Sequence, residues 1–157
     1  MKKEILKPRK TREQRKRNHK VSVEKRIKRY IKDGGKGNLD LNGTPVKKLP
    51  DNLQVGRSLD LGNTPIKELP DNLKVGGYLF LTGTPIKELP DNLKVGDYLY
   101  LANTLIKGLP DNLQVGGNLY LPNTPLSKEY SKEEIRSMIE EKGGYVKEYI
   151  ILWKNKY

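Results

Sequence analysis

Leucines recur every 20 residues through the middle of the chain, with polar residues at fixed places between them. Each unit follows the pattern L-x-L-x-x-T-x-I-x-x-L-P-D-N-L-x-V-G and begins at Leu39, Leu59, Leu79, Leu99 and, in a shortened form, Leu119. A fixed period in this range is typical of a solenoid in which each repeat packs only on its neighbours. The pattern therefore predicts a repeat solenoid over residues 37–126.

The alternation within one unit predicts the path of one coil. The L-x-L pair indicates a short strand with both leucines inward, and strands of successive coils should stack in parallel at about 4.8 Å. Four more apolar positions complete the core, so that the first coil buries Leu39, Leu41, Val46, Leu49, Leu53 and Val55. A proline recurs on the return segment, where it forbids helix. We therefore expect an extended or turn-like convex side opposite the strands.

A threonine follows each strand, at positions 44, 64, 84, 104 and 124. Its hydroxyl can bond the backbone of its own coil or of the next one. A catalytic threonine would need an adjacent base, and no base recurs beside this column. We predict a structural role for it.

The ends of the chain differ in composition from the repeats. Residues 1–20 are too polar to bury a core, so we expect a disordered basic tail there. Residues 21–36 predict an N-terminal capping helix that begins after Ser22 and ends at Gly34-Gly35. Its apolar stripe consists of Val23, Ile27, Tyr30 and Ile31.

Residues 127–157 predict a C-terminal cap made of a helix and a final strand. Ser131 and Glu134 form a capping-box pattern before a helix at 132–142. The segment from Tyr145 to Trp153 is rich in aromatic and β-branched residues and favours a strand.

Positive charge is concentrated at the N-terminus. Residues 1–36 hold 16 Lys and Arg against 4 Asp and Glu, whereas residues 37–157 hold 15 of each, which leaves a net charge of +12. Such asymmetry favours contact with nucleic acid or another polyanion, although the same tail could serve only solubility. The candidate contacts are Lys7, Arg9, Lys10, Arg12, Arg15, Lys16, Arg17, Lys20, Lys25, Arg26 and Arg29.

The repeat resembles the leucine-rich repeat family. L-x-L-x-x-T-x-I, as in residues 79–86, corresponds to the L-x-L-x-x-N-x-L of that family, and the 20-residue length with recurrent Leu-Pro is similar to its short bacterial and phage-type members. Threonine here replaces the usual asparagine, and Val-Gly replaces the leucine expected before the strand. The resemblance implies a curved solenoid whose concave sheet binds a partner, usually a protein.

Residues beside the inward leucines should point out onto the concave face, because side chains alternate along a strand. Five of them are aromatic and fall in coils three to five: Tyr78, Phe80, Tyr98, Tyr100 and Tyr120. Asp40 and Asp60 lie beside them in coils one and two. Aromatics also favour strands for stability, but an exposed contiguous patch is typical of an interaction site. Stacked bases are disfavoured because the neighbouring carboxylates repel phosphate.

Several functional classes are excluded or disfavoured by residue content. The chain has no cysteine and one histidine, so thiolate catalysis and cysteine-based zinc sites are excluded, as is the cysteine-dependent ubiquitin ligase fused to such repeats in some bacterial effectors. We find no nucleophile–base pair, metal-ligand cluster or cofactor fingerprint, so we expect no enzyme, no metal and no cofactor. No segment reaches the ~20 apolar residues of a transmembrane helix or has the form of a secretory signal. We expect a cytoplasmic protein without a small-molecule ligand.

Two functions remain. The first is a non-enzymatic protein-interaction module that uses the concave aromatics, as an adaptor or as an inhibitor of a host or defence protein. The alternative is an RNA- or DNA-binding protein that uses the basic tail and first helix, with binding that is independent of sequence and steeply dependent on salt.

Overall fold

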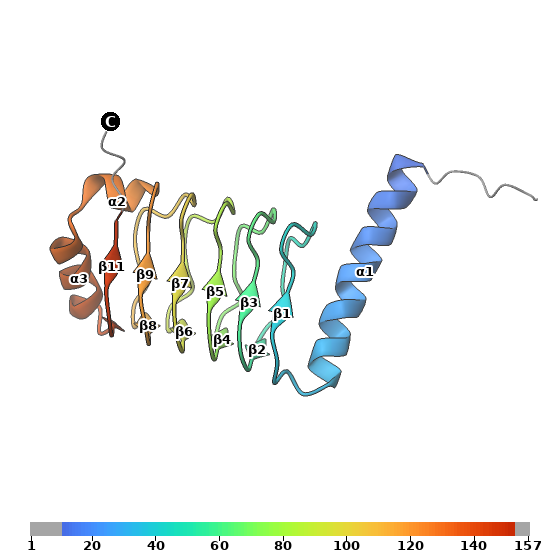
Figure 1. Ribbon diagram of the computed structural model, residues 1–157, viewed down its shortest axis with the longest axis horizontal. Helices are drawn as coiled ribbons and strands as arrows, with labels where there is room; N and C mark the ends of the chain where they lie inside the picture. The colour runs from blue at the N-terminus through green and yellow to red at the C-terminus, as the bar shows by residue number, and fades with distance from the viewer. Residues whose placement is uncertain (1–10, 153–157) are drawn as a thin grey trace, which may run out of the picture.

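The chain folds as a parallel-strand β-solenoid with a long helix at its N-terminal end. The computed structural model describes residues 11–152, apart from the side chains of 19–21. Figure 1 shows successive coils lying side by side, with the helix α1 (Arg12–Lys32) at the β1 (Leu39–Asp40) end and two shorter helices at the β11 (Ile150–Ile151) end. The predicted stacked-repeat architecture is confirmed at this level. No helix in the described part of the chain is both long and apolar enough to cross a membrane.

The L-x-L pairs form the first of two sheets. Neighbouring strands are parallel and pair in a 20-residue register, so that Leu59 lies opposite both Leu39 and Leu79. The strand order is β1 (Leu39–Asp40), β3 (Leu59–Asp60), β5 (Leu79–Phe80), β7 (Leu99–Tyr100), β9 (Leu119–Tyr120) and β11 (Ile150–Ile151).

A second parallel sheet forms on the return side, where the sequence predicted only extended or turn-like chain. In each of its strands a valine is buried and the residue before it faces outward. Two residues are too few for a period-two pattern to stand out, which is why the strand was missed. The strand order is β10 (Tyr145–Val146), β8 (Gln114–Val115), β6 (Lys94–Val95), β4 (Lys74–Val75) and β2 (Gln54–Val55).

The core lies between the two sheets and follows the predicted pattern. All six apolar positions of each complete unit are buried, and the most exposed of them, Leu69, is 8 % exposed. The threonine column bonds its own coil, because each hydroxyl donates to the leucine carbonyl three residues earlier. This distance is 2.7 Å from Thr44 to Leu41 and 2.9 Å from Thr124 to Leu121. The predicted structural role of threonine is confirmed.

A column of glycines at the end of the second-sheet strands holds neighbouring coils very close together. An added Cβ on Gly96 would overlap the carbonyl oxygen of Gly76, and one on Gly116 would overlap that of Gly96. The same backbones are joined by hydrogen bonds, with Gly96 N donating to Val75 O at 2.8 Å. Only a residue without a side chain fits this approach.

The helix α1 (Arg12–Lys32) is longer than the predicted capping helix and corrects the expectation of disorder for residues 12–20. Its N-cap is Thr11 rather than Ser22. Thr11 Oγ1 accepts a hydrogen bond from Gln14 N at 3.2 Å, and Gln14 Oε1 accepts one from Thr11 N at 2.8 Å. Arg, Lys, Gln and Glu are good helix formers, a property that polarity alone does not reveal. Residues 1–10 lie outside the described part.

The C-terminal half of α1 packs against the first coil. Val23 and Ile27 are buried in the common core, whereas Ile31, predicted in the same stripe, is 48 % exposed. Tyr30 Oη donates to Gly37 O at 2.8 Å and accepts from Gly56 N at 3.2 Å. These contacts attach the helix to the open end of the solenoid.

At the other end, α2 (Pro125–Glu129) and α3 (Lys132–Glu141) replace the return segment of the last coil. The predicted capping box is confirmed, since Ser131 Oγ accepts from Glu134 N at 3.2 Å and Glu134 Oε2 accepts from Ser131 N at 2.8 Å. The predicted strand from Tyr145 is instead the two short strands β10 and β11, one in each sheet. Trp153 lies outside the described residues.

We expect Gly96→Ala to destabilise the fold by about 1–3 kcal/mol, because the added methyl group forces two backbones apart. Gly108→Ala is the matched control, since a Cβ at Gly108 meets nothing within 4 Å. Urea unfolding monitored by circular dichroism would measure both. Equal stability of the two variants would show that the close approach of coils does not limit the fold.

Candidate functional site

The outward positions of the first sheet are set by the strand register. Each strand places a buried leucine beside an outward residue, and the paired outward residues line up across the sheet. From β1 to β9 this column reads Asp40, Asp60, Phe80, Tyr100 and Tyr120. The sheet therefore changes from acidic to aromatic between the second and third coils, as the sequence predicted.

Three aromatic rings of this column form a continuous stack. The centroids of Phe80 and Tyr100 lie 4.7 Å apart with an interplanar angle of 11°, and those of Tyr100 and Tyr120 lie 4.5 Å apart at 13°. These separations are close to the strand spacing of a parallel sheet. The register of the solenoid thus sets the stacking distance.

Two further tyrosines form a second row beside the stack. Tyr78 and Tyr98 meet edge to face with centroids 5.3 Å apart, and Tyr98 also contacts Tyr100 at 6.3 Å and Tyr120 at 6.1 Å. Tyr78 is 37 % exposed, and the other four rings are half-buried. We call Tyr78, Phe80, Tyr98, Tyr100 and Tyr120 the aromatic face. The predicted clustering is observed, whereas the partner-binding role stays a prediction.

The ring of Tyr98 lies directly over the backbone of the next coil. A Cβ added at Gly117 would overlap the Cδ1 and Cε1 atoms of Tyr98. The absence of a side chain at Gly117 therefore leaves the space that the ring of Tyr98 occupies.

Two carboxylates lie close to Tyr98. The pKa of Tyr98 is raised above its ordinary value chiefly by the negative charge of Glu148, then by burial and by Asp97. Burial is the main cause of the raised pKa of Tyr100, followed by the neighbouring Tyr120. Both phenols are therefore held in the neutral form that can donate a hydrogen bond.

Asp40 and Asp60, the predicted acidic neighbours, both have structural hydrogen bonds. Asp60 Oδ1 accepts from Gly62 N at 2.8 Å and from Asn42 Nδ2 at 3.1 Å, and Asp40 Oδ1 accepts from Asn42 N at 2.9 Å. Such bonds close a tight turn after each strand. The two aspartates therefore hold the chain path, and Asp60 also places a carboxylate beside Phe80 at the edge of the aromatic face.

Sequence analysis missed the last row of this surface. Tyr149 is 73 % exposed, and its backbone N donates to Asn118 Oδ1 at 3.0 Å. Ile151 lies opposite Tyr120 in the sheet. The signal was the Y-I-I segment at 149–151, which has the outward–inward–outward order of a first-sheet strand but is separated from the repeat by the helices α2 and α3.

The predicted polyanion-binding residues lie on a different part of the molecule. Within the described side chains, Arg12, Arg15, Lys16, Arg17, Lys25, Arg26 and Arg29 all belong to α1 and are exposed. Arg26 Nη1 donates to Asp40 O at 2.9 Å and so helps attach the helix to β1. Lys7, Arg9, Lys10 and the side chain of Lys20 lie outside the described part. Figure 1 places α1 beside β1, away from β7 and β9.

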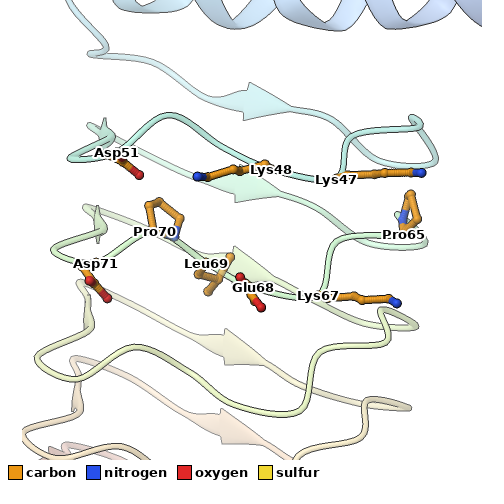
Figure 2. Close-up of a pocket in the computed structure, with 9 residues that line it drawn as sticks. All are labelled: Lys47, Lys48, Asp51, Pro65, Lys67, Glu68, Leu69, Pro70 and Asp71. Atoms are coloured by element: carbon orange, nitrogen blue, oxygen red, sulfur yellow. The ribbon is translucent and has the colours of Figure 1, made fainter.

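Shallow grooves between coils on another side of the solenoid have mixed charge. Figure 2 shows one in which Lys47 and Lys67 extend along one end and Asp51 and Asp71 lie at the other, with Glu68 between them. Because both coils place lysine at one end of the groove and aspartate at the other, the groove selects neither an anion nor a cation. Within the described residues, no three His, Cys, Asp or Glu side chains are grouped to hold a metal ion.

The chain was compared with protein-family models, with curated proteins and with solved structures, and none of them matches it. We therefore infer the function from the surface chemistry of the chain itself.

We expect Glu148→Gln to lower the pKa of Tyr98 toward its ordinary value of 10.0, because it removes the largest cause of the shift. Folding raises the pKa of Tyr98, so the folded state favours the neutral phenol. The stability that this preference contributes is complete below about pH 10, and it is lost as the pH rises through the pKa of Tyr98 in the folded protein. NMR of ring-labelled tyrosine would follow each phenol separately.

Glu129→Gln is the control for this titration, because Glu129 raises the pKa of Tyr130 instead. It should shift Tyr130 and leave Tyr98 unchanged. An unchanged Tyr98 in Glu148→Gln would refute the assigned electrostatic contact.

Proposed function

We propose that this chain is a non-enzymatic protein-interaction module of the leucine-rich repeat type that captures a protein partner on its aromatic face. The observation that carries the proposal is the mutual packing of five aromatic rings on one side of a single sheet. An adaptor or an inhibitor acting in the cytoplasm would use such a surface in the same way.

The rings are suited to binding because they are already ordered. Tyrosine is a frequent hot-spot residue and provides contact area with few rotatable bonds. Stacking and the space above Gly117 fix the rings before a partner arrives, so less side-chain entropy is lost on association. A phenol held neutral, such as that of Tyr98, can also donate a hydrogen bond across an interface.

The direct test is site-specific cross-linking in cells that naturally express the chain. A photoreactive benzoylphenylalanine would replace Ala102, which follows the strand of Tyr100 and leaves every ring in place. The control position is Lys94, an outward residue of the second sheet in the neighbouring coil. We expect a protein adduct from position 102 and none from position 94. Equal adducts from both positions, or none from 102, would overturn the proposal.

We further expect Tyr98→Ala with Tyr100→Ala to weaken binding of the captured partner by at least ~2 kcal/mol, the usual loss at a hot spot. The matched variant Tyr98→Phe with Tyr100→Phe keeps both rings and should retain most of the affinity. Calorimetric titration with the purified partner would measure the loss, and thermal unfolding would verify that both variants are folded. An Ala pair that binds normally would exclude the aromatic face.

The extended α1 favours a second candidate function, the binding of nucleic acid. This helix is 21 residues long and carries basic residues along its length. The side chains from residue 12 to 18 are all exposed. A rigid basic helix can contact phosphates without reading the base sequence. This surface lies at the β1 end, so that it could act separately from the aromatic face (Figure 1).

Fluorescence anisotropy of labelled RNA and DNA over a salt series would test this second function in the full chain. Replacing Lys25, Lys28 and Arg29 by Gln should flatten the slope of log affinity against log salt by about 0.9 for each lost contact to duplex DNA. Replacing Lys47, Lys67 and Lys87 by Gln removes the same charge from the body. If the two triple variants behave alike, or if nothing binds, α1 is not a nucleic-acid site.

A further inference from the structure

The first-sheet surface has a charge opposite to that of the chain as a whole. The chain holds 31 Lys and Arg against 19 Asp and Glu. The outward strand segments 37–42, 57–62, 77–82, 97–102, 117–122 and 148–151 contain four acidic residues, Asp40, Asp60, Asp97 and Glu148, and one basic residue, Arg57. The segments that hold the aromatic face and the last row carry no Lys or Arg.

The acidic residues lie at both ends of the aromatic face. Asp60 is paired with Phe80 in the sheet, so its carboxylate is next to the free end of the ring stack. Glu148 lies just before β11, on the other side of the face, and Asp97 directly precedes Tyr98; both are close enough to Tyr98 for their charges to raise its pKa. A cation that binds over these rings would therefore meet a carboxylate on either side.

Part of the Asp60 carboxylate is left for such a cation. Both of its hydrogen bonds to described residues, from Gly62 N and Asn42 Nδ2, are accepted by Oδ1. A planar guanidinium can lie against the outer face of Phe80 while it bonds to a carboxylate oxygen beside the ring. Aromatic rings and carboxylates together favour arginine and lysine over any anionic or neutral side chain.

We propose that the aromatic face docks an Arg/Lys-rich, extended peptide segment of the partner protein. This inference rests on the proposed function and names the chemistry that the partner presents. The cationic side chains lie against the outer face of Phe80 and beside the ring of Tyr98, and their charges are balanced by Asp60, Asp97 and Glu148.

The test uses the full chain and a short fluorescein-labelled peptide of alternating Arg and Gly, followed by anisotropy. A matched peptide with Glu in place of Arg is the first control. Because the chain has a net charge of +12, long-range attraction favours the acidic peptide, so binding of the basic one reports a local site. We expect the Arg peptide to bind at about 50 mM salt and to weaken as salt is added. Failure of the Arg peptide to bind at this salt concentration would overturn the proposal, whereas binding of the Glu peptide would report only the basic residues outside the aromatic face.

Paired variants then locate the site. Asp97→Asn with Glu148→Gln should weaken the Arg peptide about three- to tenfold, as expected for two exposed ion pairs. Glu68→Gln with Glu88→Gln changes the net charge equally in the mixed-charge grooves and should have less than about a twofold effect. Tyr98→Leu should weaken binding of the Arg peptide about two- to fivefold, whereas Tyr98→Phe retains binding. Equal effects of the two acidic pairs would overturn the proposal.

The two proposals can fail separately. If position 102 is cross-linked to a protein but the Arg peptide does not bind, the cationic docking chemistry is wrong and the interaction module stands. If sedimentation shows that the chain associates with itself and that the Arg peptide reverses this association, the aromatic face holds the basic segment of a second copy. In that case the proposal of a separate partner protein is overturned. Binding of the Arg peptide without self-association, lost in the Asp97/Glu148 pair, supports the inference.

Discussion

The structure depends on how closely the backbones of neighbouring coils can approach one another. At Gly56, Gly76, Gly96 and Gly116 no side chain separates them, and an added Cβ would overlap the carbonyl oxygen of the preceding coil. Gly76, Gly96 and Gly116 each donate a backbone hydrogen bond to the valine O of the preceding coil, and Gly56 N donates to Gly35 O, which holds the second sheet together. Because each coil is joined to the next in this way on one side, the first-sheet strands on the other side pair in a constant 20-residue register.

That register is also what creates the aromatic face. Phe80, Tyr100 and Tyr120 are far apart in sequence, yet each follows a buried leucine by one residue and so points from the sheet at the same height. Their centroid separations of 4.7 and 4.5 Å reproduce the strand spacing rather than an independent preference of the rings. Core packing, coil spacing and surface chemistry are thus consequences of the same repeat.

Sequence reasoning succeeded where the repeat itself carries the information. The six buried positions, the threonine hydrogen bonds and the outward aromatics follow from a period that recurs in every coil. It failed where the signal is short or not repeated. The second sheet has two-residue strands, and the Thr11–Gln14 capping box starts α1 inside a segment whose polarity indicated disorder. Tyr149 joins the surface only because α3 returns the chain to the sheet after the period has ended. The role of each surface depends on a partner, which is not encoded in the packing of the chain.

The constant register has a consequence for how such a surface can change over generations. A duplication of one 20-residue unit would insert a complete coil, whose outward residues would fall into the existing columns without shifting any other residue. Duplication of the unit that carries Tyr98 and Tyr100 would lengthen both rows of rings by one member each. The number of rings in each row therefore changes by one with each duplicated coil. The length of the segment that the face can hold changes with it.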